Sequence, residues 1–100
     1  DGPWKTLATD GDYIAMYLKQ SSKPLLEKCK GYLAEHFAFV FEELLQGMES
    51  YGDKAACERV ASLAVEKWES VSASQWKRLY NYAAEVKSKK VMQMVEKHIG

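Results

Sequence analysis

Apolar residues recur at intervals of three and four along almost the whole chain, and this spacing restricts the fold more than any other feature. An α-helix places such residues on one face, whereas a half-buried strand needs an apolar residue at every second position. Alternation of that second kind is nearly absent. The sequence therefore predicts an all-α fold of five or six short amphipathic helices, arranged as a compact bundle or as stacked helix pairs.

Capping residues and proline divide the first half of the chain. The segment 9–12 (Thr-Asp-Gly-Asp) carries side-chain oxygens suited to a helix N-terminus, so we expect an irregular leader over residues 1–10 and a helix over 12–20. The next helix begins at Pro24, because a proline in the first turn loses no helical hydrogen bond. The apolar stripe from Leu26 to Met48 predicts one long helix or two nearly collinear helices with a break near Phe37.

Three polar residues mark the helix starts of the second half. Asp53 caps a helix that we expect to run to about Glu69. Ser72 and Gln75 have the spacing of a capping box, and Ser88 precedes a last helix. The expected core face of the helix after Asp53 comprises Cys57, Val60, Ala64, Trp68 and Val71.

Length and composition exclude several classes of protein. One hundred residues with 47% apolar and 28% charged side chains are typical of a single folded domain, here spanning residues 1–100. The longest apolar run, residues 37–41, is far shorter than the roughly 20 residues of a membrane-spanning helix, so we expect no membrane insertion. Two cysteines give no disulfide framework, which favours an intracellular location, cytoplasmic or nuclear.

Residues able to carry catalysis are sparse. Cys29 and His36 share a helix face but lie about 10 Å apart along its axis, too far for a thiolate–imidazole pair, so we interpret them as a core and a boundary residue. Neighbouring Glu42 and Glu43 point about 100° apart and are typical of a solvated face. Zinc-ligand pairs and glycine-rich phosphate loops are absent. We therefore expect no enzymatic activity, no metal and no cofactor.

The charges are unevenly distributed although their sum is zero. Residues 34–70 hold three basic and eight acidic side chains, a net charge of −5, and residues 71–100 hold six and two, a net charge of +4. Such a separation can orient a protein partner. It also leaves open a nucleic-acid-binding surface, whose basic residues would be Lys77, Arg78, Lys87, Lys89, Lys90 and Lys97. The aromatic neighbours Trp76 and Tyr80 lie on the expected core face, which argues against that alternative.

Twelve aromatic residues exceed what one narrow helical seam can bury, and Trp4, Phe39 and Tyr82 lie off the apolar stripes. We favour packing of Trp4 across helix ends and of Phe39 on a second buried face. The other interpretation is that these side chains line a groove or an interface. The candidate partner-binding residues are Phe39, Glu42, Glu43, Tyr82, Lys87 and Lys90.

Two segments resemble the helical BACK region that follows the BTB domain in adaptor proteins. The first is 25–37 (Leu-Leu-Glu-Lys-Cys-Lys-Gly-Tyr-Leu-Ala-Glu-His-Phe) with 40–45 (Val-Phe-Glu-Glu-Leu-Leu). The second runs from Glu58 to Trp68, with an acidic start and a terminal tryptophan. The resemblance covers about half of the chain. It implies a helical spacer that helps to hold a cullin-type ubiquitin-ligase scaffold, and it implies no catalytic residue.

These observations together predict a non-catalytic protein–protein interaction module, an adaptor or scaffold whose partner is another protein. The alternative is a nucleic-acid-binding helical domain that uses the basic C-terminal face. A third class, a small-ligand binder, would require an apolar cavity lined by methionine and aromatic side chains.

Overall fold

The computed structural model describes residues 8–19 and 22–99, and helices account for nearly all of them. This part of the chain contains no strand, which confirms the all-α prediction. None of its helices is both long enough and apolar enough to cross a membrane. The elements are α1 (Asp10–Lys19), α2 (Lys23–Glu35), α3 (Phe37–Tyr51), α4 (Lys54–Glu66), the short 3-10 helix η2 (Trp68–Ser70), α5 (Ala73–Glu85) and α6 (Lys89–Glu96).

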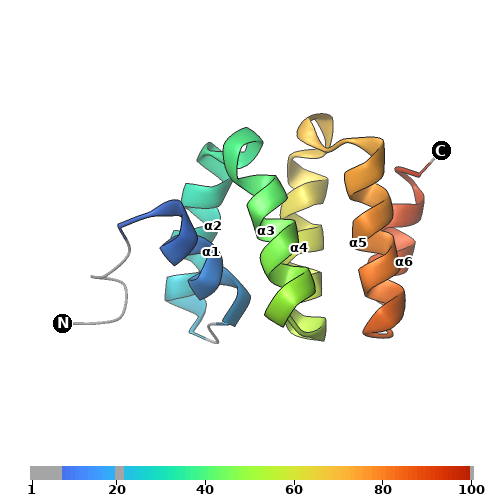
Figure 1. Ribbon diagram of the computed structural model, residues 1–100, viewed down its shortest axis with the longest axis horizontal. Coiled ribbons are helices and arrows are strands. Elements are labelled where there is room, and N and C mark those ends of the chain that lie inside the picture. The colour runs from blue at the N-terminus through green and yellow to red at the C-terminus, as the bar shows by residue number, and fades with distance from the viewer. Residues whose placement is uncertain (1–7, 20–21, 100) are drawn as a thin grey trace.

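Successive helices run antiparallel and form three pairs, α1–α2, α3–α4 and α5–α6, side by side along the long axis (Figure 1). The molecule measures 45 × 25 × 20 Å. Helices α1, α3 and α5 form the front row in this view, with α3 in contact with both of the others, and α4 contacts α6 behind them. The connections are short, so each helix packs against its neighbour in the chain. The bundle is therefore a short stack of helix pairs.

The first helix begins two residues earlier than the sequence predicts. The Thr9 hydroxyl accepts a hydrogen bond from the Asp12 backbone N–H at 3.2 Å, and the Asp12 carboxylate accepts from the N–H groups of Ala8 and Thr9 at 3.0 Å. These bonds hold the pKa of Asp12 below its usual value. Thr9 is thus the cap, and Asp10 belongs to the helix and not to the leader. Trp4 and the rest of the leader over 1–7 lie outside the described residues.

The apolar stripe of residues 26–48 is divided at His36. Helix α2 ends at Glu35 and α3 starts at Phe37, so the expected break is confirmed. The two helices are antiparallel neighbours, however, and the expectation of collinear helices is wrong (Figure 1). A second buried face on α3 includes Phe37 and Phe41, whose rings stack at 4.4 Å. This second face lets α3 pack against helices on more than one side.

The prediction for the end of α4 is wrong. The helix stops at Glu66, where the Lys67 N–H bonds to the carbonyls of both Leu63 and Ala64 and tightens the last turn into η2. The chain then turns toward α5, and Trp68 projects outward with 55% of its surface exposed. Trp68 is therefore not a core residue, although Cys57, Val60 and Ala64 on the same expected face are fully buried.

The predicted caps of the last three helices are confirmed. The Asp53 carboxylate accepts from the Ala56 N–H at 2.8 Å at the start of α4. Ser72 and Gln75 form a reciprocal capping box at the start of α5. Ser88 accepts from the Val91 N–H at 3.2 Å at the start of α6. Each cap satisfies N–H groups that the first turn of a helix leaves without partners.

Helix α1 is held against α3 and α4 by specific contacts. The Arg59 guanidinium of α4 donates to the carbonyls of Tyr17 and Leu18 at 3.3 Å, at the end of α1, where carbonyls lack helical partners. The Tyr17 hydroxyl donates back to the Arg59 carbonyl at 3.0 Å. Helix α1 crosses α3 at Gly47, where a Cβ atom would lie only 2.9 Å from Leu18 Cδ1. The missing side chain at this position permits the close approach of the two helices.

Candidate functional site

Helix α3 presents an exposed face that is aromatic at its start and acidic along its length. Phe39 is 86% exposed, and Glu42, Glu43 and Glu49 are exposed as well. The preferred interpretation of Phe39 as part of a second buried face is wrong. Successive helical residues are rotated by about 100°, so Phe39 points away from the buried Phe37 and Phe41, which lie two residues before and after it. Phe39 is thus an apolar side chain with no core to enter.

Two glutamates of α3 share one arginine of α5. The Arg78 guanidinium bonds to Glu49 through two atoms, at 2.7 and 3.3 Å, and to Glu42 at 2.6 Å. Glu42 also accepts from Gln46 at 3.2 Å and from Gln75 at 3.3 Å. The hydrogen bonds from Arg78, Gln46 and Gln75 lower the pKa of Glu42 and keep this carboxyl ionised. The network fixes the position of α5 along α3.

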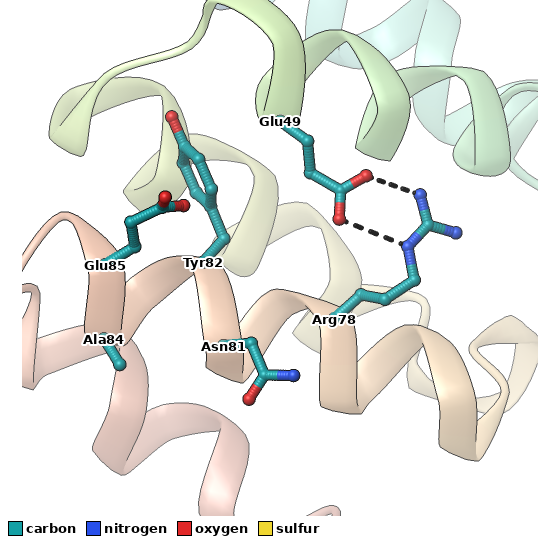
Figure 2. A pocket seen from close by; sticks show the side chains of 6 residues that line it. All are labelled: Glu49, Arg78, Asn81, Tyr82, Ala84 and Glu85. Carbon is teal, nitrogen blue, oxygen red and sulfur yellow. Dashed lines mark hydrogen bonds and ion pairs between the residues drawn. The ribbon is translucent and has the colours of Figure 1, made fainter.

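Next to this network lies an open hollow of about 670 Å³ between α3 and α5. Figure 2 shows Tyr82 and Glu85 projecting from α5 toward α3, on the side where Glu49 and Arg78 meet. The Tyr82 hydroxyl donates to the Gly52 carbonyl at 2.9 Å, which fixes the ring. The lining residues are Glu49, Arg78, Asn81, Tyr82, Ala84 and Glu85.

The surroundings of Tyr82 are electrically negative. Burial is the largest cause that raises the pKa of its phenol, followed by repulsion from Cys57 once that thiol is itself ionised, and from the carboxylates of Glu85, Asp53 and Glu49. A phenolate is disfavoured in such a field, so Tyr82 is a neutral hydrogen-bond donor and an aromatic wall. Its ring stands between Glu85 and Glu49 and gives the hollow a fixed aromatic wall (Figure 2).

The structure brings some of the predicted partner-binding residues together. Phe39, Glu42 and Glu43 lie on α3, and Tyr82 lies across the groove between α3 and α5. Glu43 is on the other flank of α3, where it lines a smaller hollow of about 270 Å³ between α1 and α3. Glu42 contacts α5 and Glu43 faces α1, so this face of α3 lies within the front row of helices α1, α3 and α5 (Figure 1).

The two predicted lysines lie elsewhere. Lys87 and Lys90 are exposed at the connection between α5 and α6, which is at the opposite end of the helices from the start of α3 (Figure 1). Lys87 has a left-handed backbone, with φ at 60°, where the chain turns into α6. Phe39 and these lysines therefore do not form one compact surface.

Three members of the proposed nucleic-acid surface are engaged in the fold. Arg78 is bound to two carboxylates. Trp76 is buried, and its ring stacks on that of His98 at 4.2 Å. Tyr80 is half-buried against the core. The remaining lysines of this set are exposed, and Lys77 lines a shallow hollow together with Tyr80.

The part that sequence reasoning missed is the role of Arg78. Its membership of a basic cluster suggested a partner, whereas it binds two carboxylates of its own chain. Glu42 and Glu49 are seven residues apart, two helical turns on one face, and this spacing was the available signal. The spacing does not reveal which distant residue binds both carboxylates.

The residues weighed for chemistry occupy structural positions. Cys29 is fully buried, which confirms it as a small core residue, and His36 is half-buried beside the Tyr32 ring at 4.4 Å. Cys29 and Cys57 are free thiols, and burial raises both pKa values, that of Cys57 to about 11. Within residues 8–19 and 22–99 no three His, Cys, Asp or Glu side chains are grouped so as to hold a metal ion.

Comparisons with protein-family models, with curated proteins and with solved structures found no match to this chain. The resemblance to the BACK region therefore stays a prediction, which rests on the two sequence segments described above.

Proposed function

We propose that this chain is a non-catalytic protein-interaction module, an adaptor or scaffold, whose partner binds the front face formed by α3 and α5. Phe39 is the apolar contact of this surface, and the residues around Arg78 form its polar part. The partner-binding residues that we retain from the sequence are Phe39, Glu42, Glu43 and Tyr82.

The observation that carries the proposal is the exposure of Phe39. A phenylalanine with 86% of its surface in water contributes almost nothing to folding in this position. Covering such a side chain in an interface would contribute about 1.5–3 kcal/mol. Aromatic side chains beside well-ordered polar groups are a frequent composition of binding hot spots. The Glu42–Arg78–Glu49 network provides that ordered polar neighbour.

The adaptor form of the proposal draws on the resemblance to the BACK region, which implies a helical spacer between other domains. An intracellular location fits two buried free thiols, since reduced cysteines persist inside cells. Nucleic acid is the less favoured partner, because Arg78 and Trp76 are engaged within the fold.

The test is capture of partners from a cell lysate by the tagged chain, washed at low and at moderate salt, with recovered protein and nucleic acid both quantified. The wild type is compared with Phe39→Ser and with Ala38→Ser. Both variants place serine in the first turn of α3 at an exposed position, so any effect of serine on the helix is shared. We expect a stoichiometric protein that survives moderate salt with the wild type and Ala38→Ser, and at least tenfold less of it with Phe39→Ser.

Two results would contradict the proposal. Equal recovery with Phe39→Ser would show that Phe39 is not part of the binding surface. Recovery of nucleic acid alone, at low salt only, would favour the basic C-terminal face, since contacts to phosphate weaken steeply as salt rises.

A further inference from the structure

The hollow between α3 and α5 has an excess of negative charge. Its lining contributes the carboxylates of Glu49 and Glu85 and the guanidinium of Arg78, a net charge of −1, and Glu42 adds a further carboxylate beside it by binding the same guanidinium. Both oxygens of Glu49 already accept from Arg78. Glu85 forms no hydrogen bond or ion pair with any residue that the structure describes, and it lines the hollow. The free carboxylate thus lies where a ligand can reach it.

The C-terminal ends of two helices border the hollow, and the N-terminal ends of their antiparallel partners α4 and α6, which carry partial positive charge, lie at the same end of the bundle. Helices α3 and α5 run in the same direction, so their C-terminal ends lie at the same end of the molecule, beside the hollow (Figure 1). Carbonyl groups at a helix C-terminus carry partial negative charge, which a basic residue in the last turn usually offsets. Neither helix has one. The nearby Lys54 and Lys87 form no ion pair with the described residues.

The hollow is also rigid and partly aromatic. The hydrogen bond from the Tyr82 hydroxyl to the Gly52 carbonyl holds the ring beside Glu85, and the two hydrogen bonds that Arg78 donates to Glu49 hold those side chains in place. A cation over an aromatic ring is attracted by the negative face of the ring, more strongly as water is excluded. A volume of about 670 Å³ admits the side chain of lysine or arginine. Little ordering would be needed on binding, because the walls are already fixed.

We propose that this hollow binds a lysine or arginine side chain of a partner protein, and that Phe39 contacts an apolar residue of the same partner segment. The inference rests on the proposed function and adds the chemistry of the partner. Phe39 and Glu49 are ten residues apart on α3, which corresponds to about 15 Å. A helical partner would therefore carry its apolar residue and its cation about ten residues apart.

The direct test is a nuclear magnetic resonance titration of the ¹⁵N-labelled chain with Nα-acetyl-arginine methylamide and the corresponding lysine compound. The neutral glutamine compound is the control ligand. We expect saturable shifts confined to the ends of α3 and α5 with both cations, and none with the glutamine compound. Glu85→Gln should weaken the binding at least threefold. Glu69→Gln makes the same charge change at an exposed position in η2, at the other end of α5, and should leave the binding unchanged.

Three results would overturn the inference: shifts spread over all surface carboxylates, equal shifts with the glutamine compound, or an unchanged affinity with Glu85→Gln. Lysate capture with Glu85→Gln separates this inference from the proposed function. Loss of the Phe39-dependent protein would support the cation site. Full retention of that protein would refute the cation site while leaving the interaction module in place.

Discussion

Ser88 is the single buried polar side chain among the described residues. Replacing it with alanine should lower the stability of the fold more than the loss of an exposed serine cap does. Its hydroxyl accepts from the Val91 N–H at 3.2 Å in the first turn of α6. Water cannot reach that N–H once the hydroxyl is removed, because Ser88 and Val91 are both fully buried. Ser72 makes the same bond, to the Gln75 N–H at 3.2 Å, but at an exposed site.

The two serines allow the cost of burial to be isolated. Loss of a serine cap costs about 1 kcal/mol, and a buried N–H left without a partner adds about 1 kcal/mol or more. We therefore expect Ser88→Ala to lower the free energy of unfolding by about 2 kcal/mol and Ser72→Ala by about 1 kcal/mol. In a domain of this size the melting temperature should fall by about 8 °C or more for Ser88→Ala and by about 4 °C for Ser72→Ala.

The assay is urea unfolding of both variants, followed by circular dichroism and by tryptophan fluorescence. Coincident transitions by the two probes show that the whole chain unfolds together, which the comparison requires. If Ser88→Ala costs no more than Ser72→Ala, water or a shift of α6 satisfies the Val91 N–H and the reasoning from burial is refuted.

Further expectations follow from burial and charge elsewhere in the fold. Trp68→Ala should lower the free energy of unfolding by less than about 1 kcal/mol, because the ring is largely exposed, whereas Trp76→Ala, which removes a buried ring, should lower it by about 3–5 kcal/mol. Chemical unfolding of both variants checks the contrast, and a large loss of stability for Trp68→Ala would contradict the placement of η2. Cys57 is fully buried and its pKa is raised to about 11, so alkylation of its thiol at pH 8 should be at least 100-fold slower in the folded chain than in urea. Mass spectrometry can follow the reaction, and rapid labelling without denaturant would argue against this core. The pKa of Glu42 is lower in the folded chain than in the unfolded chain, so its stabilising contribution is complete above the unfolded value near 4.5 and is lost as the pH falls through the folded value. Arg78→Met should therefore flatten the dependence of stability on pH below about 4.5, measured by urea unfolding at a series of pH values, and an unchanged slope would show that the pair does not couple to folding.

Local chemistry explains which parts of the fold the sequence could predict. The caps at Asp53, Ser72 and Ser88 act on N–H groups three residues away, so the responsible side chains can be recognised in a short stretch of sequence. The end of α4 is not decided locally. Trp68 continues the three-four spacing of Ala64, yet the chain must leave the helix there to reach α5, and the turn removes Trp68 from the core.

The candidate site was predictable only in its exposed members. Glu42 and Glu43 lie off the apolar stripe and are polar, which indicates an exposed face. Phe39 also lies off the stripe, but as an apolar side chain it left burial and exposure open, and burial was the wrong choice. The Arg78 contacts join residues 29 and 36 positions apart, and periodicity carries no information about such pairs. The hollow beside Tyr82 also depends on how α5 is placed against α3, which is a property of packing and not of either helix alone.

The order of the helix pairs along the long axis has a consequence for folding kinetics. Neighbours in the chain are neighbours in space, so most contacts close short loops and little chain entropy is lost before each pair forms. Helical chains with such local connectivity fold within about microseconds to milliseconds. The same order places α5 and α6 as a terminal pair, whose contacts outside the pair are chiefly with α3 and α4.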